Sequence, residues 1–383
     1  MFSNRLRNLH PYVPGEQPKD RDYIKLNANE NPYPPHHSVC AALKTMLDTQ
    51  SARLGLYPDP DTNELRDEIA KMLNSTGGVL CRATVKDDGT CIPSAQDALP
   101  QPITRDMIFC GNGSDEVLSF VFYTFFDSDR PLVLPQFTYS FYPVYCGYYS
   151  IPMEQIPLMP DWAIDSAAMI SAAQQTDSCI VFANPNAPTG LALTRAQVAQ
   201  ILDKAPKNRI VVVDEAYCDF GGESCLPLLA DYKNLVIVRT FSKSLSFAGM
   251  RLGYVVSAPE LIQAIFTVKN SFNHFPADFL AQTAGIASCK AAAYYAENAR
   301  LVAQERDSLL NFLRQRGWFA LNSATNFVFA KKEGHAGSAV YKAVKQAGIL
   351  IRHFDTPGIE DFVRITIGTH EQMDLLKNVL EAL

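Results

Sequence analysis

The chain has little of what marks proteins that bind nucleic acids or membranes. Its 383 residues carry 34 Lys and Arg against 40 Asp and Glu, giving a net charge of −6. No basic stretch is interleaved with aromatic residues, so nucleic acid and anionic membranes are excluded as partners. No run approaches the roughly 18 apolar residues of a membrane span, and the start, MFSNRLRNLHPYVPGE, has no apolar signal segment. We therefore expect a cytoplasmic protein.

Cysteine and histidine spacings typical of metal sites are also absent. The nine cysteines are odd in number and form no C-x-x-C pair, and the seven histidines include no H-x-x-x-H pattern. Several cysteines lie in apolar runs such as MIFC and SCIVFA, which predicts buried thiols in a reducing compartment. We expect no metal site.

Short apolar runs alternate with helical stretches between about residues 105 and 256. The runs are DMIFC, PLVLP, SCIVFA, RIVVVDE, NLVIVRT and RLGYVVS. Apolar runs without polar alternation are typical of strands buried on both faces, so they predict an α/β domain with a mostly parallel sheet between helices.

Other elements surround this domain. Helices are expected near 38–50 and 61–74, in a stretch of about 40 residues after 276, and at 337–347. The segments NFVFAKK, GILIRHF and FVRITIG predict strands of a smaller α+β unit. Residues 79–104 mix turn formers and polar residues, which indicates a surface loop or short hairpin of unknown purpose.

Polar sequences follow several of the buried runs, where open parallel sheets bind ligands. They are CGNGSDE, ANPNAPTG, VDEAY and RTFSK. The first is a Gly-rich turn that enters a helix, an arrangement that binds anions, although Ser114 could simply cap that helix. The two prolines of the second could likewise only fix a turn.

Lys243 and Asp214 suggest the chemistry of this edge. They end neighbouring βα units and could bind opposite ends of one flat ligand, whereas on a surface they would form an unremarkable salt bridge. A lysine amine beside an anion site and a buried acid indicates a Schiff-base enzyme with pyridoxal phosphate, whose phosphate Thr240, Ser242 and Arg251 would surround.

Nine motifs, in order along the chain, then show a resemblance. They are LNANENP (26–32), YPDPDTNELRDEIA (57–70), GNGSDE (111–116), TY (138–139), NPNAPTG (184–190), DEAY (214–217), RTFSK (239–243), MRLGY (250–254) and VRITIGTHEQ (363–372). The chain resembles the fold-type-I pyridoxal-phosphate aminotransferases, class II, and among them the histidinol-phosphate aminotransferase family. The resemblance implies an aspartate-aminotransferase-like fold: 1–45 an N-terminal arm and the start of a small domain, 46–275 a large cofactor-binding domain, and 276–383 a C-terminal small domain.

The resemblance also implies roles for individual residues. Lys243 would bind pyridoxal 5′-phosphate covalently and move a proton between the substrate and the cofactor, while Asp214 would keep the pyridine nitrogen protonated. The other cofactor-binding residues implied are Gly113, Ser114, Asp115, Thr240, Ser242 and Arg251 for the phosphate, with Tyr57 from a partner subunit, and Tyr139, Asn186 and Tyr217 for the ring. The implied substrate-binding residues are Tyr12, Asn29, Asn186, Arg352 and Arg364. For Tyr139 ordinary core packing is the alternative, and for Arg352 a structural salt bridge.

The implied activity is transamination between L-histidinol phosphate and 2-oxoglutarate, giving imidazole acetol phosphate and L-glutamate in histidine biosynthesis. The implied assembly is a homodimer with shared active sites. Two alternatives stay open: an aromatic amino acid aminotransferase, because the same fold binds flat side chains, and a lyase resembling phosphothreonine decarboxylase, which would keep the same lysine, aspartate and phosphate site.

Overall fold

All six predicted runs form strands of one sheet. The computed structural model describes residues 6, 9–12 and 15–383. The strands are β4 (Ile108–Gly111), β5 (Leu132–Pro135), β7 (Ile180–Ala183), β8 (Val211–Asp214), β9 (Leu235–Thr240) and β10 (Gly253–Ser257). With β6 (Met153–Ile156) they are ordered β4-β10-β9-β8-β7-β5-β6, and only β10 runs antiparallel to its neighbours. The predicted α/β fold is confirmed.

Helices cover both faces of this sheet because its strands are apolar on both sides. Along β8, Val211 and Val213 pack into one apolar cluster and Val212 into the other. One face carries α4 (Gly113–Phe125), α5 (Tyr142–Tyr149) and α8 (Pro259–Phe272), and the other carries α3 (Asn63–Thr76), α6 (Ser166–Thr176), α7 (Arg195–Lys204) and α9 (Phe279–Lys290). Helix α7 begins with the capping box that Thr194 and Gln197 form.

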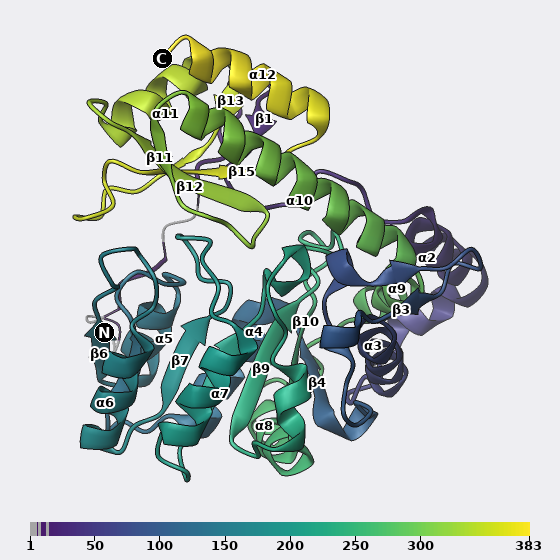
Figure 1. The fold of residues 1–383 in the computed structure, drawn as a ribbon. Coiled ribbons are helices and arrows are strands. Elements are labelled where there is room, and N and C mark those ends of the chain that lie inside the picture. Colours follow the sequence, from purple (N-terminus) through teal and green to yellow (C-terminus); the bar gives the residue numbers. More distant parts are fainter. Residues whose placement is uncertain (1–5, 7–8, 13–14) are drawn as a thin grey trace.

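The C-terminal part of the chain forms a second, smaller sheet above the first (Figure 1). Its strands are β11 (Trp318–Ala320), β12 (Phe327–Lys332), β15 (Val363–Thr366) and β14 (Arg352–His353), all antiparallel, with α11 (Gly337–Gln346) and α12 (His370–Glu381). The N-terminal strand β1 (Ile24–Lys25) pairs in parallel with β13 (Ile349–Leu350) beside this sheet.

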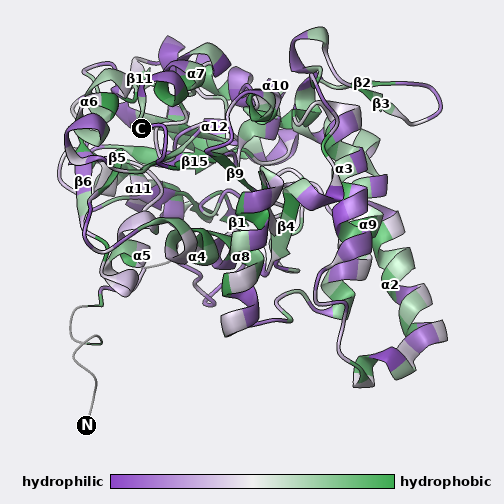
Figure 2. Ribbon diagram, turned by 90° about the horizontal axis from the view of Figure 1, so that it is seen from below, coloured by the Kyte–Doolittle hydropathy of each residue, from purple (hydrophilic) through white to green (hydrophobic). Residues whose placement is uncertain are grey.

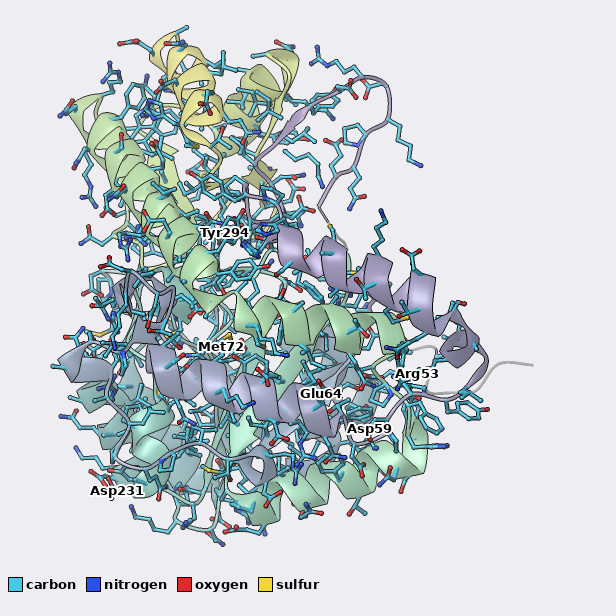
Figure 3. All side chains as sticks on the ribbon, turned by 90° about the vertical axis from the view of Figure 1, so that its right-hand side faces the viewer. Arg53, Asp59, Glu64, Met72, Asp231 and Tyr294 are labelled. Carbon is cyan, nitrogen blue, oxygen red and sulfur yellow. The ribbon has the colours of Figure 1, made fainter. Side chains whose placement is uncertain are left out.

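The long helix α10 (Ala292–Gln315) leads from the large unit into the small one (Figure 1). It follows α9 directly, so the helical stretch expected after residue 276 consists of two helices. Helix α2 (His37–Gln50) lies along α9, and Tyr294 at the start of α10 faces the residues that precede α2 (Figure 3). Its hydroxyl donates to the Pro34 carbonyl at 2.9 Å.

Residues 79–104 include the short hairpin that the sequence allowed for. Strands β2 (Thr84–Val85) and β3 (Cys91–Ile92) pair and project from the body of the molecule (Figure 2). The base of the segment is fixed by Asp97, a fully buried carboxylate that pairs with Arg82 at 2.8 Å and with Arg195 at 3.0 Å. This ion-pair cluster joins the segment to the start of α7.

Two details differ from what the sequence predicted. Strand β6 was missed because it lies at the sheet edge, where Met153 and Gln155 are exposed and interrupt the apolar pattern. The cysteines are free thiols, but not all are buried as expected: Cys40 on α2 is exposed, and Cys81, Cys91 and Cys179 are half-buried. Among the described residues, none of the helices has the length and apolar character needed to span a bilayer.

Candidate active site

A cavity of about 360 Å³ lies between the two sheets, beyond the carboxyl ends of the parallel strands. The large unit contributes Tyr139, Tyr217 and Lys243 to its lining, and the small unit contributes Arg352 and Arg364. The N-terminal arm contributes residues including Tyr12 and Asn29. Residues from opposite ends of the sequence therefore meet in one cavity, as open parallel sheets favour.

Hydrogen bonds fix the turn that carries Lys243. Strand β9 ends three residues before it, the Asn31 amide donates to the Lys243 carbonyl at 3.0 Å, and Ser244 Oγ donates to Asp219 Oδ2 at 2.5 Å. The Lys243 amine donates to the carbonyl of Ala28 at 3.3 Å. The amine thus lies at the cavity wall, while its turn is anchored to both the arm and the large unit.

Asp214 is the last residue of β8 and is 4% exposed. Its Oδ1 accepts from the Ala216 N–H at 3.1 Å and its Oδ2 accepts from the Tyr142 hydroxyl at 3.0 Å. In the part of the chain that the structure describes, no ion pair reaches this carboxylate. Burial raises the pKa of Asp214 to about 6, although both hydrogen bonds oppose the rise.

The next residue, Glu215, has a different environment. Its Oε2 lies 2.5 Å from Arg239 Nη2, its Oε1 accepts from the Cys225 N–H at 2.5 Å, and both side chains of the ion pair are buried. Of the two adjacent carboxylates, only Asp214 therefore lacks a cationic partner among the described residues. A buried carboxylate in that state favours a cationic ligand group.

Tyr139 and Tyr217 both line the cavity. The Tyr139 hydroxyl donates to Asp115 Oδ1 at 2.9 Å. The Tyr217 hydroxyl accepts from the Asn29 amide at 2.9 Å, and Asn29 in turn bonds Thr366 of β15. These bonds link the arm to both units of the molecule.

Asn186 is buried beside the cavity, not on its lining. Its Nδ2 donates to the Phe137 carbonyl at 2.9 Å and lies 3.2 Å from Thr189 Oγ1, whereas its Oδ1 has no partner among the described residues. Its role toward the ring therefore stays a prediction.

The N-terminus of α4 is where the sequence predicts an anion site. The residue that precedes the helix, Asn112, makes no capping bond with its side chain. Gly113 adopts φ of +77°, and a Cβ there would lie 2.5 Å from Arg251 Nη2, so the guanidinium lies directly over the first turn. Asp115 Oδ2 pairs with that guanidinium at 2.9 Å. Free N–H groups, the helix dipole and an arginine together suit a phosphate.

The hydroxyl residues of the lysine turn lie in the same region of the sheet edge. Thr240 is the last residue of β9 and its Oγ1 accepts from the Ser242 N–H at 3.1 Å. Strand β10 pairs with both β9 and β4, which brings the lysine turn and the start of α4 to neighbouring positions: Gly253 lies opposite both Thr240 and Gly111. Both hydroxyl side chains are buried.

Two arginines enter the cavity from the small sheet. Arg352 and Arg364 are directly opposite each other in the antiparallel pair β14–β15, which places both side chains on one face. Arg364 Nη2 donates to the Asn27 carbonyl at 3.3 Å, and its Nε has no partner among the described residues. Burial, together with Arg352, lowers the pKa of Arg364, so this cation favours an anionic ligand.

Several predicted residues do not line the cavity. Besides Asn186 they are Tyr57, Asp214 and the residues of the predicted phosphate site, Gly113, Ser114, Asp115, Thr240, Ser242 and Arg251. Tyr57 is 82% exposed and stacks on Phe275, with ring centroids 4.4 Å apart. It was expected to reach a partner's site, and its position in a single chain leaves that expectation untested.

Two contributors were missed from the sequence. Tyr142 could have been found from its spacing, since TYSFY places it three residues after Tyr139, at the start of a helix. The Asn31 contact with the lysine turn gives no local signal, because the two segments are more than 200 residues apart.

These groups fit the cofactor that the motifs imply. An amine, a buried carboxylate without a cation and an anion site at a helix terminus correspond to the aldehyde, the pyridine nitrogen and the phosphate of pyridoxal phosphate. The fit rests on the chemistry of the side chains present.

Known proteins resemble the chain over its whole length. Residues 21–383 match the family model for aminotransferase class I and II. The chain is 46% identical to a histidinol-phosphate aminotransferase of Syntrophus aciditrophicus, with 100% of this chain and 98% of the relative aligned. It is 42% identical to one of Acinetobacter baylyi, with 99% and 96% aligned.

The fold is also found in solved structures. The histidinol-phosphate aminotransferase of Sinorhizobium meliloti in complex with pyridoxal-5′-phosphate superposes with a TM-score of 0.82 at 23% identity, over 100% of this chain and 98% of that one. An aspartate aminotransferase of Thermus thermophilus gives 0.76 at 19% identity, over 99% of both chains.

Proposed function

The chain belongs to the class I and II aminotransferase family, and from this premise we propose that it catalyses transamination between L-histidinol phosphate and 2-oxoglutarate. The products are imidazole acetol phosphate and L-glutamate, and the reaction is a step of histidine biosynthesis. The observation that carries the proposal is 46% identity over the full chain to a histidinol-phosphate aminotransferase. Lys243 and two arginines lining one cavity are consistent with it.

The cofactor is pyridoxal 5′-phosphate. When bound, it supplies an electron-withdrawing ring that stabilises negative charge at the carbon bearing the substrate amine. Lys243 would hold it covalently, and Asp214 would accept a hydrogen bond from its ring nitrogen. The phosphate would be bound by the first turn of α4 with Gly113, Ser114 and Asp115, and by Thr240, Ser242 and Arg251.

The amine of Lys243 is the base and acid of the reaction. It lines the cavity near the Tyr217 ring, 5.7 Å from the ring centroid, and its turn is anchored by Asn31. In one half-reaction it would take the proton from the substrate Cα, and in the other it would deliver a proton to the Cα of the product. Tyr217 and Asn186 would orient the ring, and Tyr139 would cover its face.

Both substrates are anionic, and the two arginines of the small sheet would bind their anionic groups. A guanidinium donates to two oxygens of either a carboxylate or a phosphate, so Arg364 can serve both substrates in turn. Arg352, opposite it in the sheet, would add to the binding of the phosphate ester, together with Tyr12 at the mouth of the cavity. Asn29 would orient the substrate through its bond to Tyr217.

The assembly we propose is a homodimer with shared sites. Leu54, Leu56 and Tyr57 precede α3 and are more than half exposed, which is unusual for a contiguous apolar segment. A groove of about 750 Å³ beside α4 and α8 is lined by further aromatic residues, including Tyr123, Tyr148 and Phe272. Covering these surfaces with a second copy would bury them and could bring Tyr57 to the partner's phosphate site.

We propose the cytoplasm as the location, and domains that comprise residues 46–275 and 276–383, with 1–45 as the arm and the start of the small domain. The pairing of β1 with β13 supports assigning the arm to the small domain.

The test is a half-reaction. Holoenzyme is mixed with L-histidinol phosphate alone, and the absorbance of the bound cofactor is followed until it reaches the amine form. Addition of 2-oxoglutarate should then restore the original band and release glutamate. Phenylalanine serves as the comparison substrate: faster conversion with phenylalanine than with histidinol phosphate would favour an aromatic aminotransferase. Release of carbon dioxide from phosphothreonine would instead indicate a lyase.

A further inference from the structure

The hydroxyl of Tyr142 makes its hydrogen bond to a site carboxylate from outside the cavity. Tyr142 is fully buried, begins α5 and donates to Asp214 Oδ2 at 3.0 Å. Neither Tyr142 nor Asp214 lines the cavity, and the Tyr142 ring lies in the apolar cluster that includes Phe122 and Val212. Tyr139, one turn earlier, lies on the lining, and its ring packs edge-on against Tyr142 with centroids 5.5 Å apart.

The Tyr142 ring is fixed by its neighbours. It packs against Phe122 of α4, at a centroid distance of 6.1 Å, and the Tyr142 N–H bonds the Tyr139 carbonyl at 3.1 Å. Burial and the neighbouring Asp214 raise the pKa of Tyr142 well above its ordinary value, so its hydroxyl remains a donor at all working pH values. A neutral hydroxyl held this way donates to the carboxylate whenever Asp214 is ionised.

The charged groups around Asp214 oppose its ionisation. Asp115 of α4 and Glu215 raise its pKa, whereas the Tyr142 hydroxyl and the Ala216 N–H lower it. Tyr145 of α5 lies nearby and stays neutral because burial raises its pKa. The Tyr142 bond is the only side-chain hydrogen bond to Asp214 among the described residues, so it is the group in the protein that a substitution can remove.

We infer that Tyr142 is a positioning residue for transamination: it orients the Asp214 carboxylate and keeps it ionised, so that the shared proton stays on the ring nitrogen of the cofactor. The inference rests on the proposed function, because it concerns the same ring. Its alternative is a core tyrosine that happens to satisfy a buried carboxylate, with no effect on the ring.

The experiment uses holoenzyme loaded with ¹⁵N-labelled pyridoxal phosphate. The ¹⁵N chemical shift of the ring reports directly whether the nitrogen carries the proton, and it is followed against pH. Tyr142→Phe removes the hydroxyl only. The matched control is Tyr149→Phe, also on α5, whose hydroxyl bonds Ser119 at 2.6 Å and does not line the cavity.

In Tyr142→Phe the ¹⁵N shift at neutral pH should move toward that of an unprotonated ring nitrogen, because Asp214 loses a hydrogen bond that favours its ionised form and then competes better for the shared proton. The control should titrate like the wild type. Cofactor affinity, measured by equilibrium dialysis, should fall roughly tenfold in Tyr142→Phe at neutral pH. A folded Tyr142→Phe protein with the wild-type titration would overturn the inference.

A second substitution covers the case in which Tyr142→Phe does not fold. Replacement of Tyr142 by 3-fluorotyrosine keeps the ring and makes the hydroxyl a stronger donor, so the ¹⁵N shift at neutral pH should move toward that of a protonated ring nitrogen. An unchanged shift there would equally contradict the inference. No histidinol phosphate is present in these measurements, so failure of the proposed substrate assignment would leave their result standing.

Discussion

Two adjacent carboxylates, Asp214 and Glu215, should respond in opposite ways to neutral substitution. Glu215 accepts bonds from Arg239, Ser224 and the Cys225 N–H, and its charge is balanced by the buried Arg239 guanidinium. Asp214 has two neutral donors and no cation among the described residues. We predict that Glu215→Gln lowers the stability of the apoprotein. Asp214→Asn should abolish activity without lowering that stability.

The magnitudes follow from burial. Removing one partner of a buried ion pair leaves an uncompensated charge and costs about 3 to 5 kcal/mol. For Asp214, neutral substitution should have the opposite effect on the free energy of unfolding. Burial raises its pKa to about 6 in the folded chain, so the folded protein binds this proton more tightly than the unfolded chain does. The stability that this bound proton contributes is lost as pH rises from about 4 to about 6. Above pH 6 the buried charge lowers the free energy of unfolding by about 3 kcal/mol. Asp214→Asn removes that cost at neutral pH.

Urea denaturation of the apoproteins at pH 5 and pH 8 measures both effects. Asp214→Asn should be at least as stable as wild type at pH 8, and its advantage over wild type should be smaller at pH 5. Glu215→Gln should be less stable than wild type at both pH values. Glu215→Gln that still folds should retain the cofactor and turn over at low temperature. Equal loss of stability in both variants would refute the distinction between a structural and a chemical carboxylate.

Three further outcomes are expected. Lys243→Ala should abolish turnover while still binding the cofactor noncovalently, and borohydride should then attach no cofactor to the chain; attachment would mean that another lysine is the anchor. Mixed Tyr57→Phe and Lys243→Ala subunits should recover activity through heterodimers with one complete site, and proven exchange without recovery would argue against shared sites. Arg364→Ala should impair both half-reactions by roughly 2 to 4 kcal/mol, and Arg352→Ala should impair histidinol phosphate more than glutamate in stopped-flow measurements. Equal losses in the latter would contradict a separate role for the phosphate.

The strands of the large sheet could be predicted because each is buried on both faces and reads as an unbroken apolar run. The positions of Lys243 and Asp214 could be predicted for a related reason, since Asp214 ends such a run and Lys243 follows one by a few residues, so both lie at the edge of the sheet. Strand β6 could not, because an edge strand with exposed residues such as Gln155 has no such pattern.

Contacts between distant segments could not be predicted from the sequence. That Glu215 is a structural residue depends on Arg239, 24 positions later, and nothing within DEAY distinguishes its two carboxylates. The role proposed for Tyr57 likewise depends on a second chain. Side-chain roles set by local strand context could thus be predicted, and those set by pairing across the fold could not.

The asparagine-rich stretch 27–31 shows how such pairing joins the two halves of the site. The backbone of Leu26 bonds both Leu350 and Thr366 of the small unit, at 2.8 and 3.0 Å. Five residues later, Asn31 bonds the backbone of Lys243 in the large unit. Between them Asn29, at a φ of +55°, bonds Tyr217 and Thr366, one from each unit. Asparagine tolerates that backbone conformation and offers both donor and acceptor in a short side chain. The separation between the reactive amine and the arginines of the small sheet is therefore set in part by this stretch, so that a shift of the small sheet would act on both the anion-binding groups and the lysine turn.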